Sequence, residues 1–364
     1  MIDTCYTRKV SKRLEKNSIE TKIVEGCEGE SSVMENNSSP AKWPKILARF
    51  EHSRFSYSLW QLVNSLVPFF ALCVLAHWSL SYSYWLSWLA MIPASGFLIR
   101  IFIIFHDCCH YSFFKNRKVN EVLGFLTGLL VFCPYEQWKQ SHAIHHASHG
   151  NLERRGTGDI WTMTLQEYRV NSRWKRVLYH LYRNPIVMFV VGPLFIFLVD
   201  YRFNRKGVSR KERIHTYATN AALAVLVGSM CWLLGWERFL LIQLPIFYMG
   251  AIAGVWLFYV QHQFEEAYYE HKEQWSFEQA ALKGSSFYKL PKVLQWFTGN
   301  IGFHHIHHLN PRVPNYLLEE AHAEDARLQQ VTTLTLLSSL QSLKFRLWDE
   351  ETKRFVGFWE LARR

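Results

Sequence analysis

A long stretch without charged side chains constrains the fold of this chain more than any other feature. Between Phe55 and Ile99 the sequence contains no Lys, Arg, Asp or Glu. A helix needs about 20 apolar residues to cross a bilayer, so this stretch is long enough for two such helices. Aromatic residues make up 16% of the chain, which also argues against a set of soluble domains. The sequence therefore predicts an integral membrane protein.

The apolar segments form two pairs. Residues 57–76 and 84–105 make the first pair, and residues 214–236 and 239–261 make the second. A short connection joins the members of each pair, which predicts a helical hairpin. Lys and Arg flank the open ends of both hairpins, and positive charge marks the cytoplasmic side of a membrane. We therefore predict an all-α, multi-pass integral membrane protein with two transmembrane helical hairpins, whose open ends and both chain termini are cytoplasmic.

Two further apolar segments, residues 122–135 and 185–199, are shorter than a spanning helix requires. If one of them crossed the membrane alone, either a group of histidines or the basic run 202–213 would be moved to the outer side. We therefore expect both segments to be interfacial or re-entrant helices. The polar region between them is expected to form part of a cytosolic, histidine-rich cap.

The two ends of the chain differ from its middle. Residues 1–45 are polar and rich in Ser, Asn and Glu, which predicts a disordered tail. Residues 326–364 are predicted to form a cytosolic C-terminal segment, although residues 317–343 show helical periodicity. The seven cysteines show no pairing pattern, as is usual in a reducing compartment. We expect no nucleic-acid partner.

Histidines recur in three groups with helical spacing. The first group is a pair four residues apart, and the second and third groups both repeat an i, i+3, i+4 pattern. Residues with these spacings share one face of a helix. One more histidine ends the last spanning segment, as the first pair ends the first hairpin. The nine candidate metal ligands are His106, His110, His142, His145, His146, His262, His304, His307 and His308.

Nine histidines on one predicted face indicate two metal ions. Neutral imidazole is the commonest side-chain metal ligand, and four imidazoles saturate a structural zinc. The alternative, helix capping and solvated faces, does not predict the repeated pattern. We expect no catalytic residue beyond the metal ligands themselves.

The other histidines are weaker candidates. His305 adjoins the third group but is out of phase with it, and no histidine follows at position 309. Histidines without partners at helical spacing are interpreted as ordinary residues: His149, His180, His215, His271 and His322. Hydrogen bonds from polar neighbours orient metal-bound imidazoles, and Asp107, Asp159 and Asn300 are the residues expected to do so. Asp107 is equally compatible with a solvated carboxylate at the membrane interface.

An all-nitrogen ligand set suits iron, zinc, copper or nickel, and open positions on redox-active iron are how proteins activate dioxygen. A zinc hydrolase would place a glutamate inside a His-Glu-x-x-His motif, and none of the three groups contains one. A metal transporter would place ligands or acidic residues within the spanning segments. Only His77 and His215 lie in or near such segments, and neither has a charged partner there. Dioxygen chemistry is therefore favoured over both alternatives.

The three groups as written, His106-Asp-Cys-Cys-His110, His142-Ala-Ile-His145-His146 and His304-His-Ile-His307-His308, resemble those of the membrane-bound fatty acid desaturases of the bacterial acyl-lipid type. The resemblance covers roughly residues 46–325, which are predicted to form the membrane desaturase domain. It implies two iron ions, dioxygen as co-substrate and a lipid acyl chain from which two hydrogens are removed. It also implies that His262 is the ninth ligand.

Two departures accompany this resemblance. Cys109 stands where the family often has glycine or another small residue. No fused haem module is visible, which implies a separate electron donor, a ferredoxin or a cytochrome.

The expected location is the bacterial cytoplasmic membrane. A membrane di-iron hydroxylase of lipids or hydrocarbons is the alternative enzyme, and a metal-binding or transport protein is a more remote one. The double-bond position, acyl carrier and oligomeric state stay open.

Overall fold

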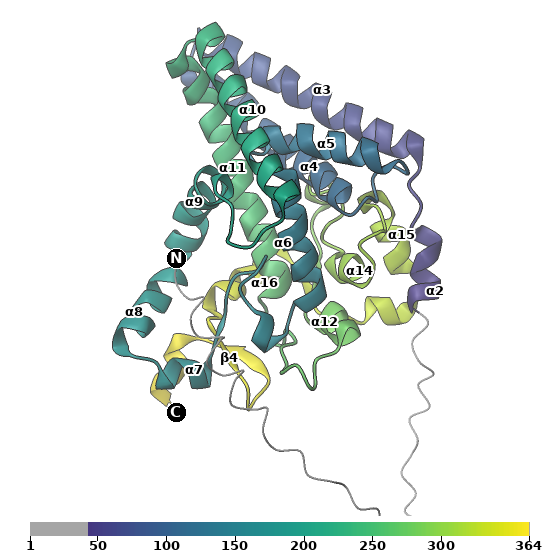
Figure 1. Cartoon of the computed structure of the whole chain (residues 1–364), viewed down its shortest axis with the longest axis vertical. Helices are drawn as coiled ribbons and strands as arrows, with labels where there is room; N and C mark the ends of the chain where they lie inside the picture. The colour runs from purple at the N-terminus through teal and green to yellow at the C-terminus, as the bar shows by residue number, and fades with distance from the viewer. Residues whose placement is uncertain (1–42, 364) are drawn as a thin grey trace, which may run out of the picture. The chain divides into compact units, whose positions relative to one another are not determined.

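The computed structural model describes residues 43–363. Most of the predicted N-terminal tail therefore lies outside the described residues. Its last three residues, 43–45, belong to a short helix, α2 (Trp43–Leu47). The fold is mostly helical, with a bundle of long helices and a cap of short elements below them (Figure 1).

Within residues 43–363, four helices are long and apolar enough to cross a membrane: α3 (Phe55–Ser79), α4 (Tyr84–Cys109), α10 (Arg210–Leu234) and α11 (Trp236–His262). They confirm the two predicted hairpins, and each helix is longer than the predicted apolar run. The connection between α10 and α11 turns at Gly235, whose φ of +81° lies in the region that favours glycine. The hairpin turns meet at one end, where Arg238 donates a 2.7 Å hydrogen bond to Ser81 Oγ.

Helix α4 is the centre of the bundle. It packs against α3, α11 and α5 (Arg117–Leu130). Its final turns, from Ile103 to Cys109, are fully buried. By contrast, α3 and α10 expose large apolar side chains such as Trp60, Val67 and Trp232. Exposed apolar surface of this extent is what lipid covers in a membrane protein.

The two shorter apolar segments are helical. Residues 122–135 fall largely in α5, which Asn116 caps by accepting hydrogen bonds from two backbone N–H groups. Residues 185–199 form a π-helical turn, η4 (Val187–Val191), followed by α9 (Gly192–Leu198). Together with α8 (Arg173–Tyr182), this stretch makes a bent pair with an angle of 58°. The bend agrees with a re-entrant or interfacial path, which stays a prediction.

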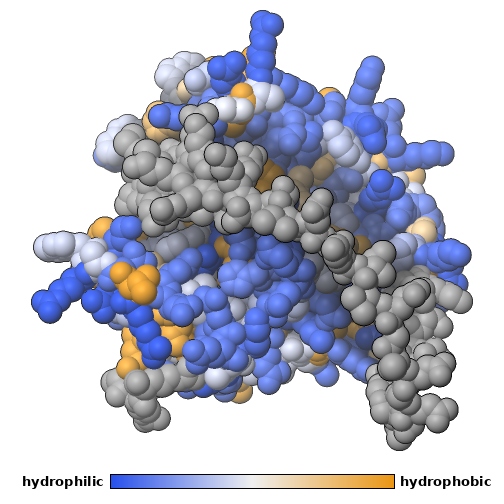
Figure 2. All heavy atoms as spheres, turned by 60° about the horizontal axis from the view of Figure 1, so that its bottom comes forward, coloured by the Kyte–Doolittle hydropathy of each residue, from blue (hydrophilic) through white to orange (hydrophobic). Residues whose placement is uncertain are grey.

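The cap is built from short helices around α6 (Tyr135–Ser148) and α14 (His304–Leu309). Figure 2 shows its outer face, which is mainly hydrophilic. The other short helices of residues 43–363 are η2 (Ala48–Phe50), η3 (Leu152–Arg154), α7 (Leu165–Val170), η5 (Asp200–Arg202), α12 (Phe277–Lys283), α13 (Lys292–Phe297), η6 (Asn315–Leu317), α15 (Leu318–Ala323), η7 (Ala326–Gln329), α16 (Leu336–Ser339), η8 (Leu340–Lys344) and η9 (Phe358–Arg363).

Five short strands in the described part of the chain were not expected. β1 (Met163–Thr164) pairs in parallel with β4 (Leu347–Asp349), which pairs in antiparallel with β5 (Arg354–Val356). β2 (Phe287–Tyr288) pairs in parallel with β3 (Thr333–Leu334). The strands tie the C-terminal segment onto the cap, where the buried Trp348 ring lies 5.4 Å from that of Tyr269.

Residues 317–343, whose sequence shows helical periodicity, do not form one continuous helix. The structure breaks this stretch into α15, η7, β3, α16 and η8. Asp325 caps η7 and Thr335 forms a capping box with Ser338, so the side chains start new helices instead of continuing one. The run Val331-Thr-Thr333 between them is β-branched, which favours an extended backbone.

The hairpin turns and the histidine groups lie at opposite ends of the spanning helices, which generates a labelling prediction. Ser81 at the first turn and Glu273 in the cap are both exposed. In intact cells, a membrane-impermeant maleimide should label Ser81→Cys above the level of the parent chain, and should label Glu273→Cys only after the membrane is permeabilised. Labelling of Glu273→Cys in intact cells would contradict a cytoplasmic cap.

Candidate metal centre

Four elements bring histidines to the junction between the bundle and the cap. The last turn of α4 carries His106, and His110 caps its end. Helix α6 carries the second group, α11 ends at His262, and α14 carries the third group. Tyr111, with φ of +57°, then turns the chain away from α4.

All nine predicted ligands come together, and they do so in two clusters. In each cluster, the potential ligand atoms lie within 4.8 Å of one another. The five-histidine cluster consists of His106, His110, His142, His146 and His307, and the four-histidine cluster consists of His145, His262, His304 and His308.

The second and third groups each supply both clusters. On α6, the i, i+4 pair His142 and His146 joins the five-histidine cluster, while His145 joins the other. On α14 the assignment is reversed: the i, i+4 pair joins the four-histidine cluster and His307 joins the five-histidine cluster. The rings of His146 and His308, one from each cluster, stack with centroids 4.3 Å apart. The clusters are therefore neighbours held by the same two helices.

The spacing of the ring nitrogens fits metal coordination. Nε2 of His142 lies 3.1 Å from Nε2 of both His106 and His146. In the other cluster, Nε2 of His304 lies 2.9 Å from that of His262 and 3.2 Å from that of His308. With metal–nitrogen bonds of about 2.1 Å, two ligands at a right angle are about 3.0 Å apart, whereas tetrahedral ligands are about 3.4 Å apart. These spacings are short enough for the rings of each cluster to share one metal ion.

A neutral imidazole carries only one N–H, which limits how these contacts can be satisfied by hydrogen bonds alone. His304 Nε2 faces two other Nε2 atoms, and Nε2 of both His110 and His307 is buried with no hydrogen-bond partner among the described residues. Buried nitrogen lone pairs that face one another need a shared cation. The donor set therefore fits a metal ion in each cluster.

Neighbouring groups fix the tautomers of two of these rings. His106 Nδ1 donates to Asp107 Oδ1 at 3.2 Å. Asp107 Oδ2 in turn accepts from the backbone N and from Nδ2 of Asn315, at 2.7 and 2.8 Å. His262 Nδ1 donates to the carbonyl oxygen of Gly284 at 3.0 Å. Because Nδ1 carries the proton in both rings, each presents an unprotonated Nε2 to its cluster.

Burial sets the charge of the cap histidines. It lowers the pKa of His142, His145 and His146 on α6 well below the usual range of imidazole. The pKa values of His304, His307 and His308 on α14 are lowered in the same way. These rings are therefore neutral at neutral pH, the state in which imidazole binds a metal.

The other two residues expected to orient ligands differ from Asp107. Asp159 accepts a 2.8 Å hydrogen bond from the backbone N–H of Gly156, and burial raises the pKa of its carboxyl to about 6. It lies beside His145, in a further potential ligand group with His149. Asn300 donates to the backbone oxygen of Asn315 at 3.2 Å. Asn300 is therefore connected to the site only through Asn315, the residue that holds Asp107.

His149 was expected to be an ordinary histidine, yet it lies against the four-histidine cluster. Its ring centroid is 4.0 Å from that of His262, and its Nε2 donates to Gly284 O at 3.0 Å. Sequence reasoning missed it, although it follows His145 by four residues and so shares its helix face. Trp138 was missed as well, and its ring stacks on His142 with centroids 4.2 Å apart.

The remaining histidines lie outside both clusters. His305 contacts His322 through a 3.0 Å Nε2–Nδ1 contact, on the side of α14 that faces away from the metal ligands. His180 stacks on Phe358, and His271 lies between Glu153 and Glu350.

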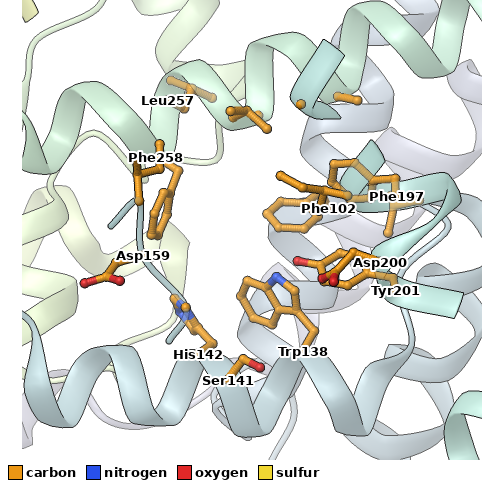
Figure 3. Close-up of a pocket in the computed structure, with 18 of the residues that line it drawn as sticks. Phe102, Trp138, Ser141, His142, Asp159, Phe197, Asp200, Tyr201, Leu257 and Phe258 are labelled. Atoms are coloured by element: carbon orange, nitrogen blue, oxygen red, sulfur yellow. The ribbon is translucent and has the colours of Figure 1, made fainter. Parts of the chain in front are cut away.

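A cavity of about 570 Å³ leads from the clusters into the bundle. Its lining includes His106, His142 and His304 and is otherwise mostly apolar. Figure 3 shows Trp138, Phe102 and Phe258 facing the open space beside His142. On α11 the lining runs from Gln261 back to Phe247, which at 1.5 Å per residue is about 20 Å along the helix. The shape is that of a deep, mostly apolar pocket that ends at the histidine clusters.

Comparisons with known proteins agree with this geometry. The family model described as fatty acid desaturase matches residues 83–333. A fatty acid desaturase of Bacillus subtilis (strain 168) is 56% identical over 314 residues, which cover 86% of this chain and 89% of the relative. An endoplasmic reticulum omega-3 fatty acid desaturase of Vigna radiata is 26% identical, covering 68% of this chain and 67% of the relative. A chloroplastic omega-6 fatty acid desaturase of Arabidopsis thaliana is 29% identical, covering 61% and 49%.

The adjacent residues His305 and His307 provide a matched test of the clusters. Both are buried on α14, but only His307 belongs to a cluster. His307→Ala should lower the metal bound per chain by about half or more, because it removes one ligand from the five-histidine cluster. His305→Ala should keep the parent metal content. Metal analysis of the purified chains measures both, and equal metal content in the two variants would contradict the assignment.

Proposed function

This chain belongs to the fatty acid desaturase family, and from that premise we propose that it introduces a double bond into a lipid acyl chain at a histidine-held di-iron centre, using dioxygen and two electrons. The observation that carries this proposal is the apolar cavity whose inner end is lined by histidines of both clusters. Such a cavity suits a long hydrocarbon chain.

Each cluster would hold one iron ion. Iron bound by imidazoles supplies, together with dioxygen, an oxidant strong enough for unactivated C–H bonds. The five-histidine and four-histidine clusters, used in full, would provide the protein ligands. Asp107 would position His106, and Asn315 would in turn hold Asp107 through two hydrogen bonds. The Gly284 carbonyl would position His262.

The chain's own residues would bind the substrate and exclude water. The apolar side chains of α4, α9 and α11 that line the cavity would bury the acyl tail. Trp138, packed between Phe102 and His142, would close the cavity beside the five-histidine cluster. A dry site of this kind keeps reactive species from water. The charged residues of the lining, Asp159, Asp200 and Arg205, lie outside both spanning hairpins, so the part of the cavity between these helices suits a hydrocarbon.

Two further parts of the proposal concern the surroundings of the enzyme. The electrons would come from a separate ferredoxin or cytochrome. The protein would lie in the bacterial cytoplasmic membrane with the histidine clusters on the cytoplasmic side. Lys and Arg concentrated next to the histidine-bearing ends of both hairpins support this orientation.

The activity itself is the first test. In a host that supplies a suitable reductant, the protein should convert lipid acyl chains into products lighter by two hydrogen atoms, and this should require oxygen and iron. The His307→Ala variant is the matched control. Mass spectrometry of the lipids measures the outcome. Products heavier by one oxygen atom would favour the hydroxylase alternative, and an unchanged profile with iron bound and reductant present would count against both.

Gly254 on α11 offers a test of the cavity as the acyl site. It lines the cavity, and a Cβ there would meet nothing within 4 Å, so a larger side chain enters the space without strain. It precedes His262 by eight residues, or about 12 Å along the helix. Gly254→Leu should lower activity on long acyl chains relative to short ones by about tenfold.

Gly228→Leu is the matched control for this substitution. Gly228 lies on α10, also has nothing within 4 Å of its Cβ position, and does not line the cavity. The chain-length profile of this variant should equal that of the parent. Competition between acyl chains of different length measures the chain-length profile of both variants. Identical profiles for the two variants would show that the acyl tail does not lie in this cavity.

A further inference from the structure

Helix α8 exposes an apolar stripe on a part of the chain that is otherwise polar. Trp174, Val177, Leu178 and Leu181 are 79%, 56%, 51% and 57% exposed. They occupy positions i, i+3, i+4 and i+7, which form one face of a helix. A contiguous exposed apolar face of this kind marks a contact with a protein or a membrane.

The opposite face of α8 fixes how the helix is rotated. Tyr179 is buried and accepts a 3.0 Å hydrogen bond from the backbone N–H of Met163. Arg183, directly after the helix, is fully buried and donates to Thr162 Oγ1 at 3.1 Å and to Phe345 O at 3.2 Å. The protein therefore holds one face of α8 firmly and leaves the apolar face uncovered.

Exposed apolar residues continue beyond the stripe. After α8, Ile186, Val190 and Leu198 are also exposed and do not line the cavity, and they lead along η4 and α9. This stretch packs against the spanning helix α11, where Tyr248 donates a 2.8 Å hydrogen bond to Val190 O. Figure 1 shows α8 and α9 as one arm at the edge of the molecule beside α11. Figure 2 shows hydrophobic residues gathered at the same side of a mainly hydrophilic face.

The charges of α8 are all of one sign. Its sequence, RWKRVLYHLY, contains three basic residues and no acidic residue. Arg173 and Lys175 are exposed, and so is Arg169 in the preceding helix. An apolar face with aromatic residues, flanked by Lys and Arg, is the composition of helices that lie in a membrane interface and bind anionic lipids.

We infer that α8 lies in the headgroup layer of the bilayer on the histidine side, with its apolar stripe in the acyl region and its basic residues on anionic lipid headgroups. The arm that it begins also walls the substrate cavity, because Tyr182, Val187 and Val191 line that cavity. The bilayer surface is thus the partner of α8. The cavity wall that the same arm forms is then the wall that faces lipid. This inference does not depend on the chemistry at the metal centre.

The test places a fluorophore on the stripe of the full chain. In a background with Cys5, Cys27 and Cys231 replaced by Ser, the remaining cysteines are buried. Leu178→Cys and the control Glu273→Cys, which lies in the exposed cap, are labelled with an environment-sensitive dye and reconstituted in vesicles of phosphatidylcholine and phosphatidylglycerol. Lipids brominated on the acyl carbons near the headgroup should quench the dye at position 178 and leave the dye at position 273 unchanged.

An aqueous emission spectrum at position 178 without quenching would overturn the inference and leave the stripe to a protein partner. The role of lipid charge is tested separately. Removing phosphatidylglycerol should weaken the quenching at position 178 by about twofold, and Arg173→Gln with Lys175→Gln should abolish this dependence on lipid charge. Equal quenching in both lipid mixtures for the unmodified helix would overturn the assignment to anionic headgroups.

Discussion

The approach of imidazole nitrogens to one another in the two clusters is the constraint on which the rest of the structure depends. These rings are buried, and unpaired buried nitrogens cost free energy unless a cation binds them. With a metal bound, the coordination energy becomes folding energy. It would link α4, α6, α11 and α14, which are far apart in the sequence. This link would hold the buried final turns of α4 and the cap against each other.

Backbone groups that approach the rings closely support the clusters. The Gly284 carbonyl accepts hydrogen bonds from both His262 and His149. A Cβ at Gly284 would lie 2.5 Å from Ala280 O and 3.1 Å from His149 Nε2, so a larger residue would displace the ring. Gly158, with φ of +73°, also has no space for a larger side chain, because its Cβ would lie 2.9 Å from that of His145. The close approach to the histidines, and not the flexibility of the loops, therefore explains why glycine stands at these positions.

The spans and the nine histidines were predictable because absence of charge and helical spacing are local properties of the sequence. The division into clusters was not, since spacing tells which side chains share a face but not which other helix that face meets. His149 was missed although it shares a face with His145, and His305 adjoins a ligand yet turns toward His322. The short strands contain only two or three residues, too few to show a period. The stripe of α8 was hidden by the basic residues between its apolar positions.

The shared use of α6 and α14 by both clusters has a consequence for how the centre is assembled. A first metal ion would fix the rotation and position of both helices, and would thereby order histidines that belong to the second cluster. A second ion would then bind without meeting that ordering cost again, so uptake of metal would be cooperative. At limiting metal, the chains would divide into empty and fully loaded molecules. Half-loaded molecules would stay scarce.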